Sequence, residues 1–455
     1  MSTKIRYLTT SLKVLLPLAP LSLTIGYILL VINPVPLSDE WHWMEALLIP
    51  YQQGDISFWQ YITGEYSFLS HSHYFTLLFI LIDYTWFGLD FSHMAYTGLV
   101  AYVMTWLMLV WYYLSLHSYQ LKKTQCTCLL ILTLAYASPL PDFPWVLVLF
   151  EYVYYFFALG LLCLFDLSIR QKLRFEIFLI AFCFTVIFTE TIGLISVLSI
   201  LGWSLLACLT KNYSWTYSGV LWLSFLILLA LQYALLGHGI GGRSNLSDSA
   251  LAIIQQPASV LESVIITFSQ PLTDRTMLSE SSTFQNNFRL WHVGVGVIGL
   301  TLSLICLSIY IAGAGHKKSQ LPLLLFLFGL LSWATILLAR YLDVGHYIFD
   351  ARRFTRLFTV YYISAGIALS LSSHHLSRPM AITTLSVLLM FFAYASIEQY
   401  QRAEHVQNYF FNAEKEITST PANQENLEKS IPRCKSEECI DTIDFLRKNN
   451  LSVFR

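Results

Sequence analysis

Charged residues are scarce in this chain. Lys, Arg, Asp and Glu make up 12% of its 455 residues, against about 25% in a typical soluble domain. Hydrophobic residues make up 56%, and apolar runs of about 17–25 residues recur, each long enough to cross a bilayer core about 30 Å thick. The scarcity of charge therefore excludes an ordinary soluble protein. It predicts an all-α integral membrane protein whose surroundings are the lipid bilayer.

Several other features are missing. No basic stripe accompanies the net charge of −1, so nucleic acid is not an expected partner. No nucleotide-binding signature is present, and no small-residue cleavage site follows the first apolar run. We therefore expect that run to be retained as a helix rather than removed as a signal peptide. The chain also lacks the two related halves that transporters usually show.

The distribution of Lys and Arg predicts the topology, because short cytoplasmic loops carry an excess of positive charge. Lys4, Arg6 and Lys13 place the N-terminus in the cytoplasm. About eleven spans then put the later basic clusters between helices on that side and leave the C-terminus outside. The expected spans are residues 12–33, 91–115, 125–138, 145–167, 175–190, 192–209, 217–237, 291–312, 320–339, 355–372 and 380–397.

Residues 74–89 test this count. They are apolar, but they number only sixteen and contain Asp83. Counting them as a span would place Lys122 and Lys123 outside and invert every later loop. A short amphipathic stretch of this kind is better interpreted as lying in the membrane interface. We therefore expect a long first external loop that contains juxtamembrane helices.

The expected spans divide the chain into one polytopic domain and three large external segments. These are residues 1–397 for the domain, 34–90 and 238–290 for two loops within it, and 398–455 for the C-terminal tail. The tail is polar and contains Cys434 and Cys439, five residues apart. On the oxidising side of a membrane such a pair predicts a disulfide, with two free thiols as the alternative.

An acidic pair follows the first span at once. Pro34 and Pro36 end the helix, and Asp39 and Glu40 come directly after them. A carboxylate at the depth of the lipid headgroups is costly unless it binds a cation, takes a proton or holds a polar substrate. Asp39 and Glu40 are therefore the leading catalytic candidates.

The rest of the first loop is rich in aromatic residues and contains two histidines. Trp41, Trp43 and Tyr61 are typical of an interfacial belt, since each side chain is apolar at one end and forms hydrogen bonds at the other. For His71 and His73 three roles stay open: ligands, proton carriers, or caps of an interfacial helix.

Charged residues near other external helix ends complete the set of candidates. Arg340, Arg352 and Arg353 are expected outside, against the positive-inside rule, and their planar guanidinium groups suit phosphate. Binding of anionic headgroups without catalysis is the alternative for them. Glu151 and Glu190 are candidates to line a cavity shared with the acidic pair, or to be structural partners of an external arginine.

Together these features resemble the GT-C glycosyltransferases, multi-pass enzymes that use polyprenyl-phosphate sugars. The resemblance rests on one long helix followed by Ser38-Asp39-Glu40-Trp41, on Phe58-Trp59 with the later Ser70-His71-Ser72-His73, on Ala351-Arg352-Arg353-Phe354 before a late helix, and on an ending similar to that of bacterial members. It covers nearly the whole chain, with short motifs. Two positions depart from the family pattern, since Tyr74 follows His73 where members have Arg, and Phe354 replaces Tyr.

The resemblance implies a mechanism on the external face. The donor would be a sugar on a polyprenyl phosphate, and the acceptor an envelope glycan or lipid. Asp39 would be the general base, with Glu40 as the alternative base or as a residue that orients the acceptor. Arg352 and Arg353, with Arg340, would bind the donor phosphate and stabilise it as it leaves.

Metal dependence stays open. Some family members bind a divalent metal at the acidic motif, where Asp39, Glu40 and either His71 or His73 could supply ligands. No other cofactor is implied.

Two rival classes remain. A transporter or lipid flippase would place charges near the bilayer midplane, and an envelope-polymer polymerase or ligase would carry its signature loop late in the chain. Brief cytoplasmic loops, the expected external disulfide and the lack of an organelle signal predict a bacterial inner membrane protein with an external C-terminus.

Overall fold

The computed structural model of the chain describes residues 3–33, 35–36, 39–63, 74–117, 121–138, 145–188, 190–210, 213–236, 246–273, 287–344, 349, 354–419 and 437–454. Every regular element in these residues is helical, and no strand occurs among them. The all-α class predicted from composition is therefore confirmed for the described part of the chain.

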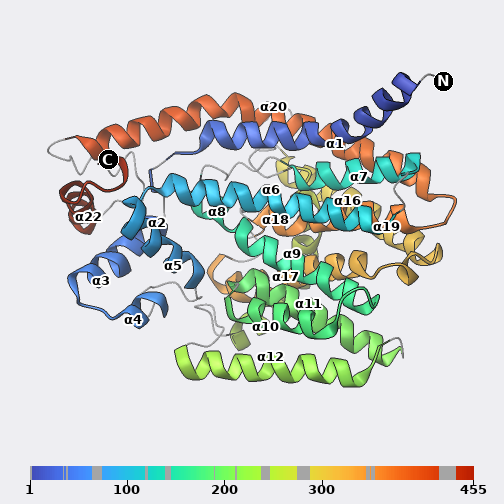
Figure 1. Cartoon of the computed structure of the whole chain (residues 1–455), viewed down its shortest axis with the longest axis horizontal. Helices are drawn as coiled ribbons and strands as arrows, with labels where there is room; N and C mark the ends of the chain where they lie inside the picture. Colours follow the sequence, from blue (N-terminus) through green and yellow to red (C-terminus); the bar gives the residue numbers. More distant parts are fainter. Residues whose placement is uncertain are drawn as a thin grey trace.

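The helices form two groups (Figure 1). Apart from α22, the helices of twelve or more residues build an elongated bundle: α1 (Thr3–Val31), α6 (Phe91–Ser115), α7 (Lys123–Tyr136), α9 (Tyr152–Ile169), α10 (Phe175–Phe188), α11 (Glu190–Leu209), α12 (Trp215–Leu236), α14 (Pro257–Ser269), α16 (Phe288–Ala312), α17 (Leu321–Val344), α19 (Val360–Leu371) and α20 (Ser377–Thr418). Helix α22 (Glu437–Lys448) lies at one end of the bundle, beside the short helices of the first loop (Figure 1). Shorter elements connect or extend them: α2 (Asp39–Trp43), η1 (Met44–Leu48), α3 (Ile49–Gln53), α4 (Phe58–Thr63), α5 (Tyr74–Ile82), η2 (Asp83–Phe87), α8 (Val146–Phe150), α13 (Leu246–Gln255), η4 (Gly315–Lys317), α18 (Thr355–Phe358) and η7 (Ser452–Phe454).

The apolar helices are those of a multi-pass membrane protein. Six described helices are long and apolar enough to cross a bilayer, or seven if the bent pair of α13 and α14 counts as one span. The eleven spans expected from sequence all fall on helices, but length and composition establish only these six or seven. Within residues 74–89, α5 and η2 cover Tyr74–Phe87, which is shorter than this criterion requires. The same holds for four segments of the expected spans: Pro17–Val31, Phe175–Ile187, Trp215–Leu231 and Thr355–Leu371.

Helices α1 and α20 run side by side and in the same direction (Figure 1). The hydroxyl of Tyr400 donates to the carbonyl of Leu23 at 2.7 Å, and seven residues further along both helices the Gln407 side chain donates to the carbonyl of Leu30 at 2.8 Å. The residues that follow α1 and the residues that follow α20 therefore emerge at the same end of the bundle. We call this the first-loop end.

The C-terminal tail packs onto the first loop instead of standing apart from it. Helix α20 continues to Thr418, so the first third of the expected tail prolongs a membrane helix. Helix α22 then contacts η1, and the backbone N–H of Ser452 donates to the carbonyl of Gly88 at 2.9 Å. The tail and the first loop thus form one layer at the first-loop end.

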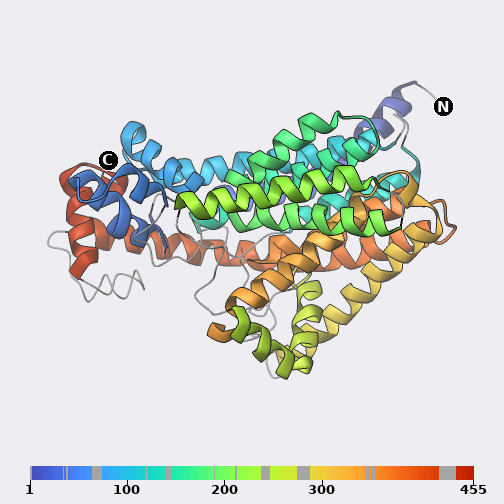
Figure 2. The same ribbon diagram turned by 90° about the horizontal axis from the view of Figure 1, so that it is seen from below.

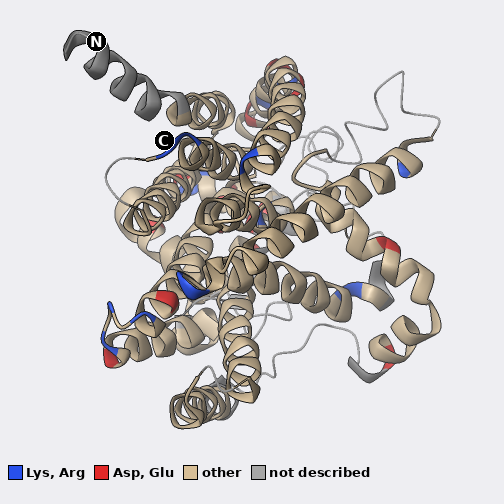
Figure 3. Ribbon diagram, turned by 90° about the vertical axis from the view of Figure 1, so that its right-hand side faces the viewer, with Lys and Arg blue, Asp and Glu red and all other residues tan. Residues whose placement is uncertain are grey.

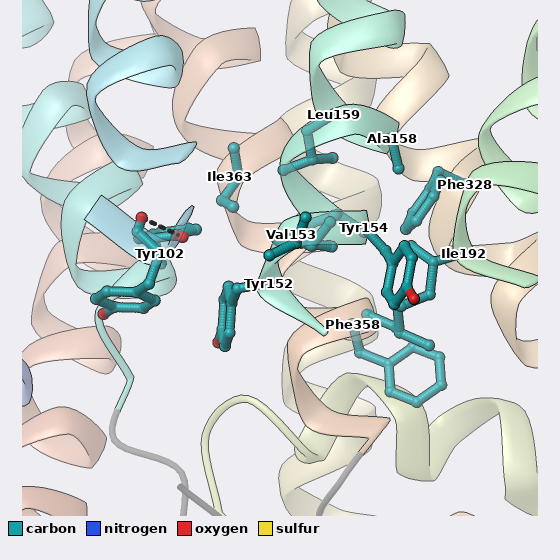
Figure 4. Packing of buried hydrophobic residues seen from close by; sticks show 14 of the residues in the cluster. Tyr102, Tyr152, Val153, Tyr154, Ala158, Leu159, Ile192, Phe328, Phe358 and Ile363 are labelled. Carbon is teal, nitrogen blue, oxygen red and sulfur yellow. Dashed lines mark hydrogen bonds between the residues drawn. The ribbon is translucent and has the colours of Figure 1, made fainter. Parts of the chain in front are cut away.

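The span formed by α8 and α9 lies at the centre of the bundle. Its most apolar window is 78% buried inside the protein, against 44% for α6 and 33% for α20. Aromatic rings fill the space between it and α6, where Tyr102 faces Tyr152 edge to face at a centroid distance of 4.9 Å (Figure 4). The described core around Glu151 is therefore aromatic and tightly filled.

Part of the expected loop 238–290 is helical. Helices α13 and α14 meet at an angle of 95° and pack against α17 and α16 at one side of the bundle (Figure 2). Contact between α14 and α16 is close, because a Cβ atom at Gly296 would collide with the carbonyl oxygen of Ile265. On which side of the membrane this segment lies stays a prediction.

A buried polar cluster holds the opposite end of the bundle. The carboxylate of Asp166, fully buried near the end of α9, accepts hydrogen bonds from the Tyr112 hydroxyl and from the backbone N–H of Gln320, just before α17 begins. Arg170 lies 3.5 Å from the same carboxylate. Viewed from this end, most of the helical ribbon carries no charged residue (Figure 3).

Candidate functional site

The acidic motif begins a short helix that is anchored by buried indoles. Asp39 and Glu40 open α2, and Trp41 Nε1 donates to the carbonyl of Pro36 at 2.8 Å. Trp41 and Trp43 are 2% and 1% exposed. The expectation of an interfacial belt is therefore wrong for these indoles, whose burial fixes the start of the first loop instead.

Glu40 is fully buried and joins the first loop to the central span. Its carboxylate accepts hydrogen bonds from Trp145 Nε1 and from the backbone N–H of Leu147, both at 3.1 Å. Trp145 and Leu147 belong to the first turn of α8, whose N–H groups have no partner within the helix. A carboxylate is well suited to this position, because the helix dipole is positive there. The contacts favour an anchoring role for Glu40.

Glu151 lies one turn further along and forms an ion pair. Its backbone N–H donates to the carbonyl of Leu147 at 2.9 Å, and its carboxylate pairs with the guanidinium of Arg356. Glu151 is thus the partner of an arginine, and its role in lining a substrate cavity stays a prediction. The Arg356 side chain is only 4% exposed and that of Glu151 is 20% exposed. Glu40 docks on α8 one helical turn before the pair of Glu151 and Arg356. We call these three residues the polar layer.

From sequence, Arg356 counts among the external arginines, but it is not assigned a role in phosphate binding. It follows Thr355 at the start of α18 and belongs to the same charged segment as Arg352 and Arg353. The sequence signal was its place in that segment, four residues after Arg352. What the sequence could not indicate was that Glu151, 205 positions earlier, would be its partner.

Gln270, at the end of α14, supports the start of α18. It is 2% exposed, and its side-chain oxygen accepts from the Thr355 hydroxyl at 2.7 Å. Its side-chain nitrogen donates to the carbonyl of Phe349. A segment of the second large loop thus reaches the residue next to Arg356.

Aromatic side chains close the polar layer on the bundle side. Tyr152, Tyr154 and Tyr155 follow Glu151 directly and are at most 2% exposed. In Figure 4 the Phe358 ring from α18 lies beside this part of α9. Charge interactions are stronger where such side chains exclude water. A charged group bound at the polar layer would therefore interact strongly with Glu151 and Arg356.

Of the other site residues predicted from sequence, only Arg340 is fully described. It is half-buried at the first-loop end of α17, next to Tyr341, whose hydroxyl donates to Gln256 at 2.9 Å. Asp39 and Glu190 begin α2 and α11, and Cys439 lies in α22, but their side chains are outside the described part. His71, His73, Arg352, Arg353 and Cys434 lie wholly outside it.

Metal binding at the acidic motif stays a prediction. Among the described residues, no group of three or more His, Cys, Asp or Glu side chains could hold a metal ion. The Asp39 carboxylate, His71 and His73 do not belong to that set.

Comparison with known proteins adds no identity. No protein-family model, no curated protein and no solved structure matches this chain. The function must therefore be argued from the polar layer and its surroundings.

A second titratable pair joins the first loop to α6. Asp83 in η2 is 4% exposed, and its carboxylate lies 2.8 Å from Nδ1 of His93 in α6. Burial raises the pKa of Asp83 to about 6, although the contact with His93 opposes the rise. Asp83 lies outside the candidate spans, and Gly88, which binds Ser452 of the tail, follows η2 at once.

Proposed function

We propose that this protein is a membrane glycosyltransferase of the GT-C kind. It transfers a sugar from a polyprenyl phosphate to an envelope glycan or lipid on the external face of a bacterial inner membrane. The observation that carries the proposal is the docking of Glu40 on α8, one helical turn before Glu151 and its partner Arg356. It brings the acidic motif and an arginine to the same end of the bundle.

The reaction needs a base and a cation. Asp39 takes the proton of the acceptor hydroxyl as that oxygen attacks the anomeric carbon, and Glu40 holds the helix that carries Asp39. The bond between the anomeric carbon and the phosphate oxygen breaks, and polyprenyl phosphate leaves with the electron pair. Arg356, together with Arg352, Arg353 and Arg340 from the same stretch of sequence, supplies positive charge for the phosphate.

The burial of the polar layer supports this chemistry. Arg356 is 4% exposed, so a phosphate that reached it would meet a guanidinium screened from water and would share it with Glu151. A guanidinium already held by Glu151 has little freedom to lose when it binds an anion.

The packing of α1 against α20 supports the proposed topology. Two spans that cross the membrane in the same direction are separated by an odd number of spans, so the total from α1 to α20 must be odd. Eleven spans satisfy this condition, whereas the same set with residues 74–89 added does not. In the proposed topology the first-loop end is external.

The test uses detergent-purified full-length protein and polyprenyl-phosphate sugars with different head sugars. Turnover of at least one donor, by transfer or slow hydrolysis, is expected, together with loss of turnover in the Asp39→Asn variant. Neither binding nor turnover of any donor would overturn the proposal. Transport of an intact lipid or solute by reconstituted protein, without turnover, would instead favour a transporter or flippase.

The positions of buried charge argue against a transporter. Glu151 and Asp166, the two carboxylates of the central span Val146–Ile169, lie near its two ends rather than at its centre. Both are engaged by arginines, Arg356 and Arg170. A coupling-ion site near the midplane would need charge in the middle of such a span.

A further inference from the structure

Helices α13 and α14 are joined by a sharp break with a local cause. Pro257, the first residue of α14, has no N–H to donate and disfavours helical backbone at Gln256 before it. The two helices meet there at 95°. Tyr341 of α17 fixes the break by donating to the Gln256 side chain at 2.9 Å.

Helix α14 enters the bundle from the end at which α16 begins. Ile265 meets Gly296, and three residues later Phe268 meets Gly299, so α14 and α16 run in the same direction. The end of α14 is therefore level with a point about twelve residues into α16, or about 18 Å along its axis. The chain then begins α16 at Phe288, which lies at the end of the bundle from which α14 entered. The segment therefore goes into the bundle without crossing it.

The inner end of α14 packs against α18, which carries Arg356, and against α19, which follows it. Phe268 stacks on Tyr361 of α19 at a centroid distance of 4.0 Å, and its carbonyl accepts from the Tyr362 hydroxyl at 2.6 Å. Two residues later, the Gln270 side chain accepts from Thr355 and donates to the carbonyl of Phe349. The oxygen and the nitrogen of the buried Gln270 amide thus both form hydrogen bonds with residues near the start of α18.

We propose that residues 246–273 form a re-entrant segment, and that Gln270 at its inner end is a positioning residue for Arg356. The segment enters and leaves the membrane at the first-loop end. Gln270 sets the direction of the first turn of α18, and that turn delivers the Arg356 guanidinium to Glu151. A re-entrant segment is tolerated at membrane depth where its inner end is buried in protein. Here α14 packs against α16, and Ile266, Phe268 and Gln270 at its inner end are at most 2% exposed.

The role in anion binding rests on the proposed function, but the placement does not. Gln270 cannot exchange its two partners, because Thr355 offers a hydroxyl and Phe349 a carbonyl. An apolar side chain of similar length would fill the same space and bind neither. The substitution therefore separates packing from orientation.

The first experiment tests the re-entrant path by labelling. In a background without native cysteines, Asp248→Cys and Asn287→Cys should react with a membrane-impermeant maleimide from the same side as Ser57→Cys, which lies in the first loop. These three positions belong to described residues before α14, before α16 and before α4. Labelling of Asp248→Cys and Asn287→Cys from opposite sides would show a spanning pair and overturn the re-entrant path.

The second experiment tests the placement of Arg356. Gln270→Met should speed hydrogen exchange in residues 355–359, with Thr355→Val giving the same change from the other partner. Ser263→Ala is the matched control, because Ser263 lies in the same helix but accepts from Trp333 of α17 at 2.9 Å. Unchanged exchange in Gln270→Met and in Thr355→Val would overturn the positioning role, and the Thr355 variant decides if the Gln270 variant does not fold.

The third experiment adds turnover. If Gln270 positions the anion site, a displaced Arg356 should lose about one hydrogen bond to the donor phosphate in Gln270→Met. KM for the polyprenyl-phosphate donor should then rise about tenfold, with a much smaller change in kcat. Ser263→Ala should leave both constants unchanged. Equal losses of kcat in both variants would indicate general loosening and overturn the role. If the wild-type protein turns over no donor, the proposed function fails, while labelling and exchange still decide this inference.

Discussion

The carboxylate of Glu40 accepts a hydrogen bond of 3.1 Å from the backbone N–H of Leu147, a residue 107 positions later in the chain. This contact fastens the first loop to the start of the central span. It also accounts for the burial of a carboxylate next to the end of α1, because the exposed N–H groups of a helix start are suitable partners for a negative charge. The two members of the acidic pair need not have the same task.

The two acidic residues can be separated by substitution. Asp39→Asn should reduce sugar transfer by about 10²–10⁴-fold, the usual contribution of a general base, with little change in thermal unfolding. Glu40→Leu should lower the unfolding temperature, because Trp145 Nε1 and the Leu147 N–H lose their acceptor, at about 1–3 kcal/mol for each buried group left unsatisfied. Turnover and thermal unfolding in detergent provide the two measurements. A stable, inactive Glu40 variant beside an active Asp39→Asn would reverse the assignment.

Much of the bundle could be predicted from apolar runs. Each of the eleven expected spans falls on a helix, because a run of this length in lipid must satisfy its own backbone hydrogen bonds. The segment 238–290 was harder to interpret, because the break at Gln256 divides its apolar residues into two helices. Neither helix is long enough to span a membrane alone, whereas the two combined are. Trp41 and Trp43 were also misassigned to the interface, because residue type does not tell whether an indole meets lipid or the tail and bundle of its own chain.

The candidate site could be predicted only in part. Glu40 and Glu151 were found from their position at helix ends, but their partners depend on contacts between distant segments. Gln270 is ordinary in sequence, and only the fold brings it to Thr355 and brings Arg356 to Glu151. Buried charge in a membrane protein therefore indicates which residues matter before it indicates what they contact.

The ion pair of Glu151 and Arg356 should behave as a coupled unit. Arg356→Met alone should destabilise the protein by roughly 3 kcal/mol, near the lower end for a buried pair, because the Glu151 side chain keeps 20% exposure. The double variant Glu151→Leu with Arg356→Met should recover most of that loss, since no unpaired charge then remains buried. A double-mutant cycle of unfolding free energies measures the coupling, and additive effects would contradict it.

The tail should stabilise the first loop through Arg447. Its guanidinium donates to the carbonyls of Ser419 at 2.9 Å and Ile417 at 3.3 Å, and it lies 5.2 Å from the ring centroid of Phe454. Arg447→Ala should therefore free the tail from the end of α20 and increase proteolysis in the first loop.

Lys448 provides the matched control for this prediction, because it is the next residue in α22 and is exposed. Lys448→Ala should leave the cleavage rate unchanged. Equal cleavage of the Arg447 variant and the wild-type protein would show that the tail does not protect the first loop.

The contact between η2 of the first loop and α6, formed by Asp83 and His93, should be more stable in mild acid. We call this contact the joint. Burial raises the pKa of Asp83 from 3.8 to about 6, so the folded joint holds a proton that the unfolded chain releases. A raised carboxylate pKa contributes stability that is complete below the unfolded value and is lost as pH rises through the folded value. Hydrogen exchange at residues 83–93 should therefore be slower at pH 5 than at pH 7.5, relative to the intrinsic rates.

In Asp83→Asn this difference should shrink, since the side chain no longer titrates, whereas Asp90→Asn should retain it. A pH dependence of the same size in Asp83→Asn would assign the effect to another group.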